Sequence, residues 1–490
     1  MAGVSGGPGM TGGSGVSGQS GGARGGNPGK SAAESAAEAA AQAEAAEIYA
    51  GIVARAPEHK ISPTIDRVAE LVDLLGSPQH AYRAIHLTGT NGKSSTARMI
   101  ERLLREVGLR TGRFTSPHLH TVRERISIDG EPISARAFVD TWRDIEPYVQ
   151  MVDTSLAERG QSRLNFFEVL TAMAYAAFAD APVEVAVVEV GLGGEWDSTN
   201  VIDGEVAVFT PIARDHERWL GRELEEIAGV KAGIIKPLDP PAVVVSAEQP
   251  EEVASVIAQR AVQQGARVVA QGYDAEVAER TVAVGGQLVN LRTPAGLYTE
   301  IFLPLHGAHQ AQNALLALIA VEQFLGGGAL SGEVVEAAFA DVTSPARLEL
   351  VRSSPAVLVD AAHNPAGAQV LVDAVQEAFA FTRLVGVVGV MADKDAEGVL
   401  AVLEPLLDEV VISQSTSMRS MDPDDLAEIA RDIFDEDLVH VQANLAEAIS
   451  LAADLAEQGE RDQIATGTGV LVTGSVILAG EARAVFGKKD

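Results

Sequence analysis

The residues best able to do chemistry form a short glycine-rich run, Gly89-Thr90-Asn91-Gly92-Lys93-Ser94-Ser95, between an apolar segment and a helical pattern. Because glycine has no Cβ atom, a phosphate can approach the backbone amides, and a helix N-terminus favours negative charge. The lysine can reach the β- and γ-phosphates of a nucleotide, and a following hydroxyl can reach Mg²⁺. The run predicts an ATP-binding P-loop of a short type, because Leu87 stands where the longer P-loop pattern has glycine.

Other polar clusters follow predicted strands, and ligands bind beyond the carboxyl ends of strands in open α/β sheets. Glu189 ends a buried apolar strand, which is the position of a Mg²⁺-binding carboxylate in P-loop enzymes. Ser116 and His216 also follow strands and could serve Mg²⁺ or substrate, although a lone histidine is more often structural. The glycines at 191–194 lack the third glycine and the following helix of a dinucleotide fingerprint, which argues against a nicotinamide cofactor.

Lys231 lies in an apolar stretch, and desolvation lowers the pKa of a lysine. A neutral amine can add CO₂ and become an anionic carbamate that ligates metal, but taken alone a lysine with its charge at the surface is the commoner arrangement. Arg347, Asp360 and His363 lie at or just past a predicted domain boundary. From there they could reach a nucleotide held between two domains, although each also fits an ordinary turn.

Composition excludes several classes of protein. A chain of 490 residues that is 47% hydrophobic can bury large cores, and its formal charge of −31 argues against binding nucleic acid or an anionic membrane. There is no cysteine, so disulfides, thiolate metal sites and thiol nucleophiles are excluded. No stretch reads as a signal peptide or a membrane span. A cytoplasmic enzyme is expected.

The elements that must position these residues alternate between strands and helices. Strands are predicted at 111–115, 185–190, 205–209 and 242–245, with helices at 135–148, 166–179, 222–229 and 250–264. A β-rich stretch at 266–303 and a helix at 308–325 follow, and a second alternation runs from 356 to 473. This pattern predicts an α/β fold: a glycine- and alanine-rich disordered tail at 1–45, a doubly wound P-loop domain at 46–343, and a smaller Rossmann-like domain at 344–490. Residues 31–55 are rich in alanine and glutamate, which predicts a helix that leads into the folded part.

Taken in order, these runs resemble the folylpolyglutamate synthases and dihydrofolate synthases of the Mur ligase superfamily. The resemblance rests on Gly89–Ser95, Thr115–Leu119, Phe167–Thr171, Glu189–Gly194 with Asp197–Asn200, Asp215-His216, Lys231–Pro237, His309–Asn313, Pro345–Glu349, Asp360–Pro365 and Val472–Ser475. It implies a Mur ligase-like fold and an ATP-dependent ligase that adds L-glutamate to dihydropteroate and to reduced folates through an acyl phosphate. A monomer with small-molecule partners alone is expected.

The resemblance also assigns roles to residues of this chain. ATP would be bound by Gly89, Thr90, Asn91, Gly92, Lys93, Ser94, Ser95, Asn313, Arg347 and Asp360. Two Mg²⁺ ions would be held by Ser94 or Ser95 with Ser116, Glu189, His216 and a carbamate on Lys231. The catalytic group would comprise Lys93, His216, Lys231, Asp360 and His363. The pterin would lie against Thr64, Ile65, Asn165, Phe166, Phe167, Glu168, Trp196, Asp197 and Ser198.

The chain departs from the family pattern at three places. Ser94 replaces a glycine after the P-loop lysine, Glu195-Trp196 replaces a basic-leucine pair, and Ala346 replaces a glycine, which is tolerated unless φ is positive there. Three alternatives stay open. They are a UDP-muramoyl-peptide ligase of the same superfamily, a P-loop ATPase or kinase acting as a switch, and a non-catalytic binding protein.

Overall fold

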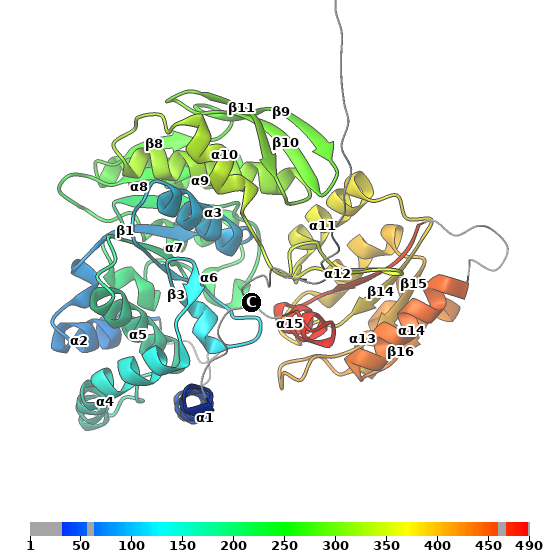
Figure 1. Cartoon of the computed structure of the whole chain (residues 1–490), viewed down its shortest axis with the longest axis horizontal. Helices are drawn as coiled ribbons and strands as arrows, with labels where there is room; N and C mark the ends of the chain where they lie inside the picture. The colour runs from blue at the N-terminus through cyan, green and yellow to red at the C-terminus, as the bar shows by residue number, and fades with distance from the viewer. Residues whose placement is uncertain (1–31, 56–62, 459–466, 489–490) are drawn as a thin grey trace, which may run out of the picture.

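Two large β-sheets organise the chain, each with helices on both faces (Figure 1). The computed structural model describes residues 32–55, 63–458 and 467–488. We call the part built on the first sheet the N-terminal unit and the part built on the second sheet the C-terminal unit. None of the helices in these described ranges is both long and apolar enough to cross a membrane.

The sheet of the N-terminal unit has eight strands in the order β4-β3-β2-β5-β1-β6-β7-β8. The strands are β1 (Arg83–Thr88), β2 (Thr111–Phe114), β3 (Ile126–Ile128), β4 (Glu131–Pro132), β5 (Val185–Glu189), β6 (Val206–Phe209), β7 (Val243–Ser246) and β8 (Arg267–Ala270). The six strands β2, β5, β1, β6, β7 and β8 pair in parallel. At one edge of the sheet, β3 pairs antiparallel with β2 and β4 pairs antiparallel with β3. The carboxyl ends of the parallel strands therefore all lie on the same side of the sheet, and the P-loop begins there, after β1.

Alternation along the central strands divides the core of the N-terminal unit into two faces. On β5, Val185 and Val187 pack on one side with α3 (Lys93–Glu106), α9 (Ala308–Phe324) and α10 (Gly332–Ala340). Ala186 and Val188 face the other side. The helices there are α1 (Ala32–Val53), α2 (Asp66–Leu74), α4 (Ala135–Glu158) and α5 (Phe166–Asp180), and beyond them α6 (Glu217–Leu220), α7 (Leu224–Ala232) and α8 (Glu251–Gln263). The predicted doubly wound arrangement is confirmed.

A small antiparallel sheet covers part of the first face and explains the β-rich stretch in the sequence. Its strands are β9 (Glu276–Ala283), β10 (Gly286–Arg292) and β11 (Leu297–Leu303), in the order β11-β10-β9. Its inward side chains join the same core as α9.

The C-terminal unit repeats the architecture on a smaller scale. Its sheet has the order β12-β13-β17-β14-β15-β16, and only β12 is antiparallel. The strands are β12 (Glu349–Ser353), β13 (Ala356–Val359), β14 (Arg383–Val388), β15 (Glu409–Ile412), β16 (Val439–Val441) and β17 (Thr468–Thr473). One face carries α11 (Pro365–Ala378), α12 (Ala396–Leu403) and α13 (Pro423–Arg431), and the other carries α14 (Leu445–Gln458) and α15 (Val476–Val485).

Several elements differ from the sequence prediction. The helix predicted over 31–55 is confirmed as α1, but residues 32–45 are not part of a disordered tail, because Ala41 and Ala45 are buried in the core that α4 shares. The remainder of the predicted tail lies outside the described residues. Helix α4 continues past Pro147 to Glu158, since its apolar face stays buried through Leu156. The β3–β4 hairpin and β12 were not predicted, because the hairpin strands are short and β12 lies at an edge of its sheet. Helices α10 and α15 were also not predicted. The boundary at 343–344 stays a prediction, with one large sheet on either side of it.

A buried ion pair joins α3 to β2 in the N-terminal unit. Arg113 Nε donates to Glu101 Oε2 over 2.5 Å, and the two side chains are 2% and 4% exposed. Removing one partner of such a pair leaves an uncompensated charge in the interior. We expect Arg113→Met to lower the free energy of unfolding by about 3–5 kcal/mol.

The double variant Arg113→Met/Glu101→Leu removes both charges and is expected to recover much of that loss. The matched control is Arg292→Met, which breaks an exposed pair with Glu276 and should cost less than about 1 kcal/mol. Urea unfolding of the four proteins measures these values. Equal losses for the buried and the exposed arginine would contradict the prediction.

Candidate active site

A cavity of about 740 Å³ lies where the carboxyl edges of the two sheets face each other. The N-terminal unit contributes the segments that follow β1, β2, β5 and β6, and the C-terminal unit contributes those that follow β13, β14 and β17. Polar residues that end separate strands in the sequence are therefore brought to one place, as expected for open α/β sheets.

The P-loop is closely packed at the carboxyl end of β1. Gly89 has φ +146°, and a Cβ added there would lie 1.9 Å from Thr210 Oγ1, so no other residue fits. Gly92 has φ +88° and a Cβ there would lie 2.8 Å from Asn313 Oδ1. Lys93 begins α3, and its Nζ donates to the carbonyl oxygens of Gly89 at 3.1 Å and Thr90 at 3.0 Å. Burial lowers the pKa of Lys93.

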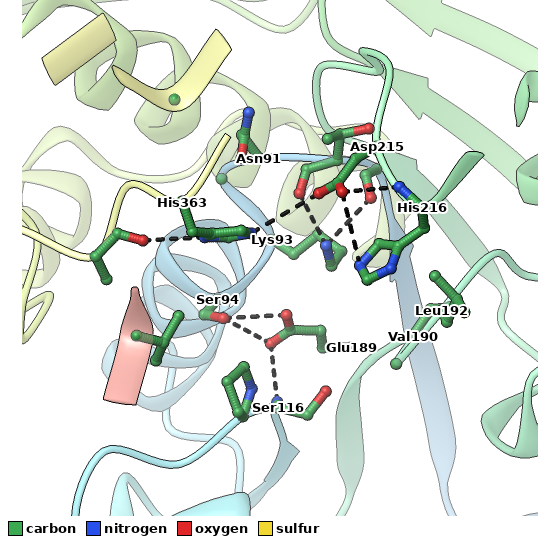
Figure 2. A pocket seen from close by; sticks show the side chains of 18 of the residues that line it. Asn91, Lys93, Ser94, Ser116, Glu189, Val190, Leu192, Asp215, His216 and His363 are labelled. Atoms are coloured by element: carbon green, nitrogen blue, oxygen red, sulfur yellow. Dashed lines mark hydrogen bonds and ion pairs between the residues drawn. The ribbon is translucent and has the colours of Figure 1, made fainter. Parts of the chain in front are cut away.

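Ser94 is the P-loop hydroxyl that faces a carboxylate. Its Oγ lies 2.8 and 3.0 Å from the two carboxylate oxygens of Glu189, and the Ser116 backbone N–H lies 3.4 Å from one of them (Figure 2). Glu189 is 1% exposed, and burial raises its pKa. Ser95 does not join this group, because its Oγ is hydrogen-bonded to Ser344 Oγ at 2.8 Å.

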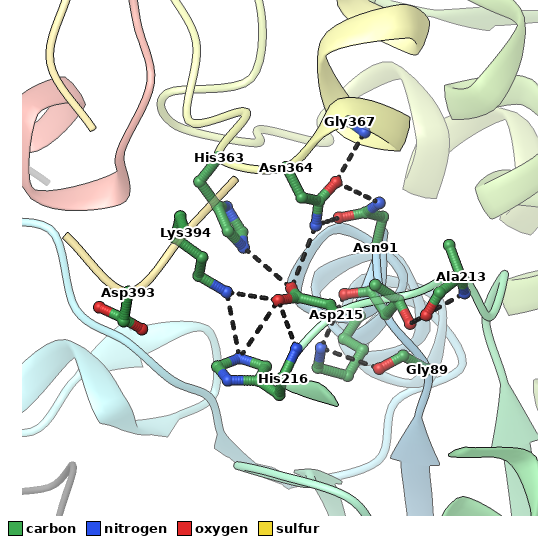
Figure 3. A network of polar contacts seen from close by, with 12 residues as sticks. Gly89, Asn91, Ala213, Asp215, His216, His363, Asn364, Gly367, Asp393 and Lys394 are labelled. Atoms are coloured by element: carbon green, nitrogen blue, oxygen red, sulfur yellow. Dashed lines mark hydrogen bonds and ion pairs between the residues drawn. The ribbon is translucent and has the colours of Figure 1, made fainter. Parts of the chain in front are cut away.

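A second polar group is centred on Asp215, and it links the two units (Figure 3). Lys394 Nζ lies 2.6 Å from Asp215 Oδ1 and 3.3 Å from His216 Nε2. Asn364 Nδ2 donates to Asp215 Oδ2 at 3.2 Å, and its amide also pairs with that of Asn91. Burial acts to raise the pKa of Asp215, but His216 and the Lys394 ammonium outweigh it and hold that pKa well below its usual range.

The two predicted histidines flank Asp215. His363 Nε2 lies 3.8 Å from Asp215 Oδ2, and its Nδ1 lies 3.0 Å from the Ala361 carbonyl oxygen. Burial, reinforced by Lys394, lowers the pKa of both His216 and His363 to about 4. Both rings are therefore neutral at physiological pH, which leaves His216 able to offer a nitrogen lone pair to a metal.

Lys231 reaches the P-loop from α7. It is 4% exposed, and its Nζ donates to the Gly89 carbonyl oxygen at 2.7 Å. Burial, with the nearby Lys93 ammonium, lowers the pKa of Lys231 to about 7. The amine is therefore partly neutral near neutral pH, which is the form that can add CO₂.

The C-terminal unit contributes Arg347 and Asp360 to the cavity. Asp360 is buried, and its carboxylate accepts the backbone N–H groups of Leu348 at 2.8 Å and Ala362 at 2.7 Å. Ala346 has φ +55° and Leu348 has φ +48°. The condition under which alanine would be unfavourable at 346 is therefore met, and Arg347 sits between two strained residues.

Part of the cavity wall is apolar and aromatic. Phe166, Phe167 and Trp196 line it together with Asn165, Asp197 and Ser198, and their contact with a pterin stays a prediction. Of the residues expected from the sequence, Thr64, Ile65 and Glu168 do not line the cavity that the described residues form. Glu168 is buried, forms a capping box with Asn165 and pairs with Arg67, so its role is structural.

The polar groups suit Mg²⁺ and a nucleotide. Among the described residues, no three His, Asp or Glu side chains stand close enough together to hold a metal ion by themselves. Mg²⁺ at phosphate sites needs only one or two carboxylates, since hydroxyls, waters and phosphate oxygens complete its shell. The Ser94–Glu189 pair has that chemistry, and Asn313 lies against the P-loop at Gly92.

Sequence reasoning missed three residues of this site. Asp215 and Lys394 belong to polar runs that follow strands, and Asn364 follows His363. Asp215 and Asn364 lie in runs that carry the resemblance, but none of the three received a role of its own, because the partner that makes it a cleft residue lies more than a hundred positions away. A search for charged residues just past strand ends would have found Asp215 and Lys394.

Comparison with known proteins gives a consistent set of similarities. The Mur ligase middle domain matches residues 87–321, and the Mur ligase glutamate ligase domain matches residues 346–476. The dihydrofolate synthase/folylpolyglutamate synthase of Mycobacterium tuberculosis is 49% identical over 448 residues, which cover 89% of this chain and 92% of that protein. The bifunctional enzyme of the same name from Bacillus subtilis is 34% identical, over 76% and 85%.

A solved structure agrees with these relatives. The Mycobacterium tuberculosis folylpolyglutamate synthase complexed with ADP and AMPPCP superposes with a TM-score of 0.87 at 46% identity, and the match covers 92% of this chain and 99% of that one.

The two P-loop serines offer a matched test of the metal site. Ser94 faces Glu189, whereas Ser95 faces Ser344. We expect Ser94→Ala to weaken Mg²⁺ binding in the presence of ADP by about tenfold or more, since the cation loses the hydroxyl oxygen as a ligand. Ser95→Ala should leave it within about twofold. Calorimetric titration of Mg²⁺ measures both. A larger loss in Ser95→Ala would reverse the assignment.

Proposed function

The chain belongs to the Mur ligase family, in its dihydrofolate synthase/folylpolyglutamate synthase branch, and on that premise we propose that it uses ATP to join L-glutamate to dihydropteroate and to reduced folates. One observation carries the proposal. A single cavity brings a P-loop lysine, a hydroxyl–carboxylate pair, an arginine of the second unit and an aromatic wall together. This arrangement suits a nucleotide at one end and a flat aromatic acceptor at the other.

The proposed reaction has two steps. The acceptor carboxylate oxygen attacks the γ-phosphorus of ATP, the bond to the bridging oxygen breaks, and ADP leaves with that electron pair. The amine of L-glutamate then attacks the acyl carbon, the carbon–oxygen bond breaks, inorganic phosphate leaves and the nitrogen loses a proton. Activation is needed because a free carboxylate is a poor electrophile.

The residues of the cavity have parts that suit the first step. Phosphoryl transfer depends on positioning and on neutralising charge rather than on covalent chemistry. Lys93 and Arg347 would approach the phosphates from opposite sides of the cavity, with Asn313 beside the P-loop. Asp360 would contribute by holding the turn that carries Arg347. His363, neutral and beside Asp215, would lie near the phosphate in transit.

Metal binding follows the same division. Ser94, Ser116 and Glu189 would hold one Mg²⁺, and His216 with a carbamate on Lys231 would hold a second. Bound Mg²⁺ would neutralise the triphosphate and withdraw charge from the γ-phosphorus. An acyl phosphate hydrolyses easily, so the enclosure of the cavity between two units suits this chemistry by excluding water.

The acceptor would occupy the aromatic end of the cavity. A flat pterin can pack on Phe166, Phe167 and Trp196, while Asp197 and Ser198 offer polar contacts. A UDP-muramoyl-peptide ligase is not favoured, since the similar proteins are named for folate chemistry. The monomeric state, the cytoplasmic location and the boundary between residues 343 and 344 stay predictions.

The function is tested by phosphate release from ATP with Mg²⁺ and L-glutamate, using 7,8-dihydropteroate, tetrahydrofolate or no acceptor. We expect release with both acceptors and a product of each that is heavier by one glutamate residue. Lys93→Ala should lower the rate by about a hundredfold or more, because the negative charge on the γ-phosphate loses the ammonium group that would neutralise it. Release that needs no acceptor would favour the ATPase alternative, and release only with a muramoyl peptide would favour the cell-wall alternative.

The carbamate is tested separately. In ¹³C-labelled bicarbonate, the protein should show a carbamate carbon resonance that Lys231→Ala lacks. The matched control is Lys236→Ala, because Lys236 pairs with Asp203 at 2.7 Å and lies on the same segment. Lys231→Ala should also lower Mg²⁺-dependent activity by about tenfold or more. An unchanged spectrum in Lys231→Ala would rule the carbamate out.

A further inference from the structure

The last helix, α15, is where the C-terminal unit touches the loop that follows β2 (Figure 1). That loop, residues 116–121, begins with Ser116, whose backbone N–H faces Glu189 in the cavity. Leu119 packs against the core of the C-terminal unit. Gly480 of α15 makes this close approach possible, since a Cβ there would lie 2.4 Å from the Leu119 carbonyl oxygen.

Arg483, one turn further along α15, bridges the two units. It is 4% exposed, its Nη1 lies 2.8 Å from His120 Nε2 in the loop, and its Nε lies 2.7 Å from Glu349 Oε2 in β12. An arginine has only donors, so the His120 nitrogen accepts. The planar guanidinium holds two partners in fixed directions, which a single ammonium does not.

The Glu349 oxygen that accepts from Arg483 also accepts the Ala346 backbone N–H at 2.8 Å. Ala346 is fully buried and left-handed, with φ +55°, and it directly precedes Arg347. Such a conformation costs free energy and persists only when neighbouring contacts hold it. On the other side of Arg347, Leu348 is held in the same way by Asp360.

The loop end of this chain of contacts is equally well anchored. The backbone N–H groups of Leu119, His120 and Thr121 all donate to the buried carboxylate of Glu124, at 2.8, 3.0 and 2.6 Å. Movement of the loop therefore displaces His120 as part of a rigid unit. A continuous path of contacts thus runs from the loop that carries Ser116 to the turn that carries Arg347.

We propose that Arg483 is a positioning residue that couples the 116–121 loop to the 346–348 turn, so that Ser116 and Arg347 reach the nucleotide only when the two units are docked. Arg483 itself does not line the cavity formed by the described residues. The inference rests on the proposed nucleotide role of Arg347. It adds to that role a device that makes nucleotide affinity depend on the docking of α15.

The test measures binding of Mg²⁺-ADP by calorimetry in the full chain. Arg483→Met should raise the dissociation constant by about tenfold, since hydrogen bonds to charged groups are lost. The matched control is Arg383→Met. Arg383 pairs with Glu409 in the same unit, but it stands at the amino end of β14, opposite to the strand end that faces the cavity. Arg383→Met should leave the dissociation constant unchanged.

Two further variants keep the test independent of any folding defect in Arg483→Met. Gly480→Ala adds a methyl group against the Leu119 carbonyl and should weaken Mg²⁺-ADP binding, whereas Gly51→Ala, a helix glycine with nothing within 4 Å, should not. His120→Leu should weaken binding less than Arg483→Met, and the double variant should be no weaker than Arg483→Met alone, because both changes break the same bond.

The outcomes separate clearly. Weaker nucleotide binding in Arg483→Met and Gly480→Ala, with non-additivity at His120, supports the coupling. If both variants bind Mg²⁺-ADP as Arg383→Met does, or if the His120 and Arg483 effects simply add, the coupling is wrong and Arg483 is only structural. Because no folate enters this measurement, a failure of wild-type chain to extend a folate would overturn the proposed function and leave this result standing.

Discussion

The carbonyl oxygen of Gly89 accepts hydrogen bonds from two lysines, one half-buried and one buried, and the rest of the cavity is arranged around that constraint. Lys93 Nζ lies 3.1 Å from it and Lys231 Nζ lies 2.7 Å from it. Burying an ammonium group is costly, and that cost appears as a lowered pKa for both side chains, with the Lys93 ammonium adding to the effect at Lys231. A bound polyanion, or conversion of one amine to an anionic group, relieves that cost. This part of the cavity is therefore electrostatically suited to phosphate, in a chain whose formal net charge is −31.

The second unit completes the balance of charge. Lys394 enters the cavity from the segment after β14 and pairs with Asp215, while Arg347 approaches from the turn before β12. Lys394 depends on a partner in the other unit, whereas the turn that carries Arg347 is held within the C-terminal unit. The left-handed residues on either side of Arg347 show that the placement is held against backbone strain by Glu349 and Asp360.

Much of the fold could be predicted from the sequence, because its long elements have strong local signals. Strands β1, β5, β6 and β14 are buried apolar runs, and the P-loop has glycines whose φ values no other residue tolerates. The elements that escaped prediction have weak signals of this kind. The hairpin β3–β4 has strands of only three and two residues. Their stability comes from packing on neighbours, which no local pattern records.

The sequence by itself indicated the groups of the candidate site: a P-loop, a carboxylate and histidines at the ends of strands, and a lysine in an apolar stretch. It did so because glycine conformations and apolar runs are local properties of the chain. Only the tertiary structure decided which groups meet. It set Ser94 rather than Ser95 beside Glu189, removed Thr64, Ile65 and Glu168 from the cavity wall, and joined Asp215 to Lys394 across 179 positions. Such pairings depend on the docking of two separately built sheets, and no spacing within either one encodes that geometry.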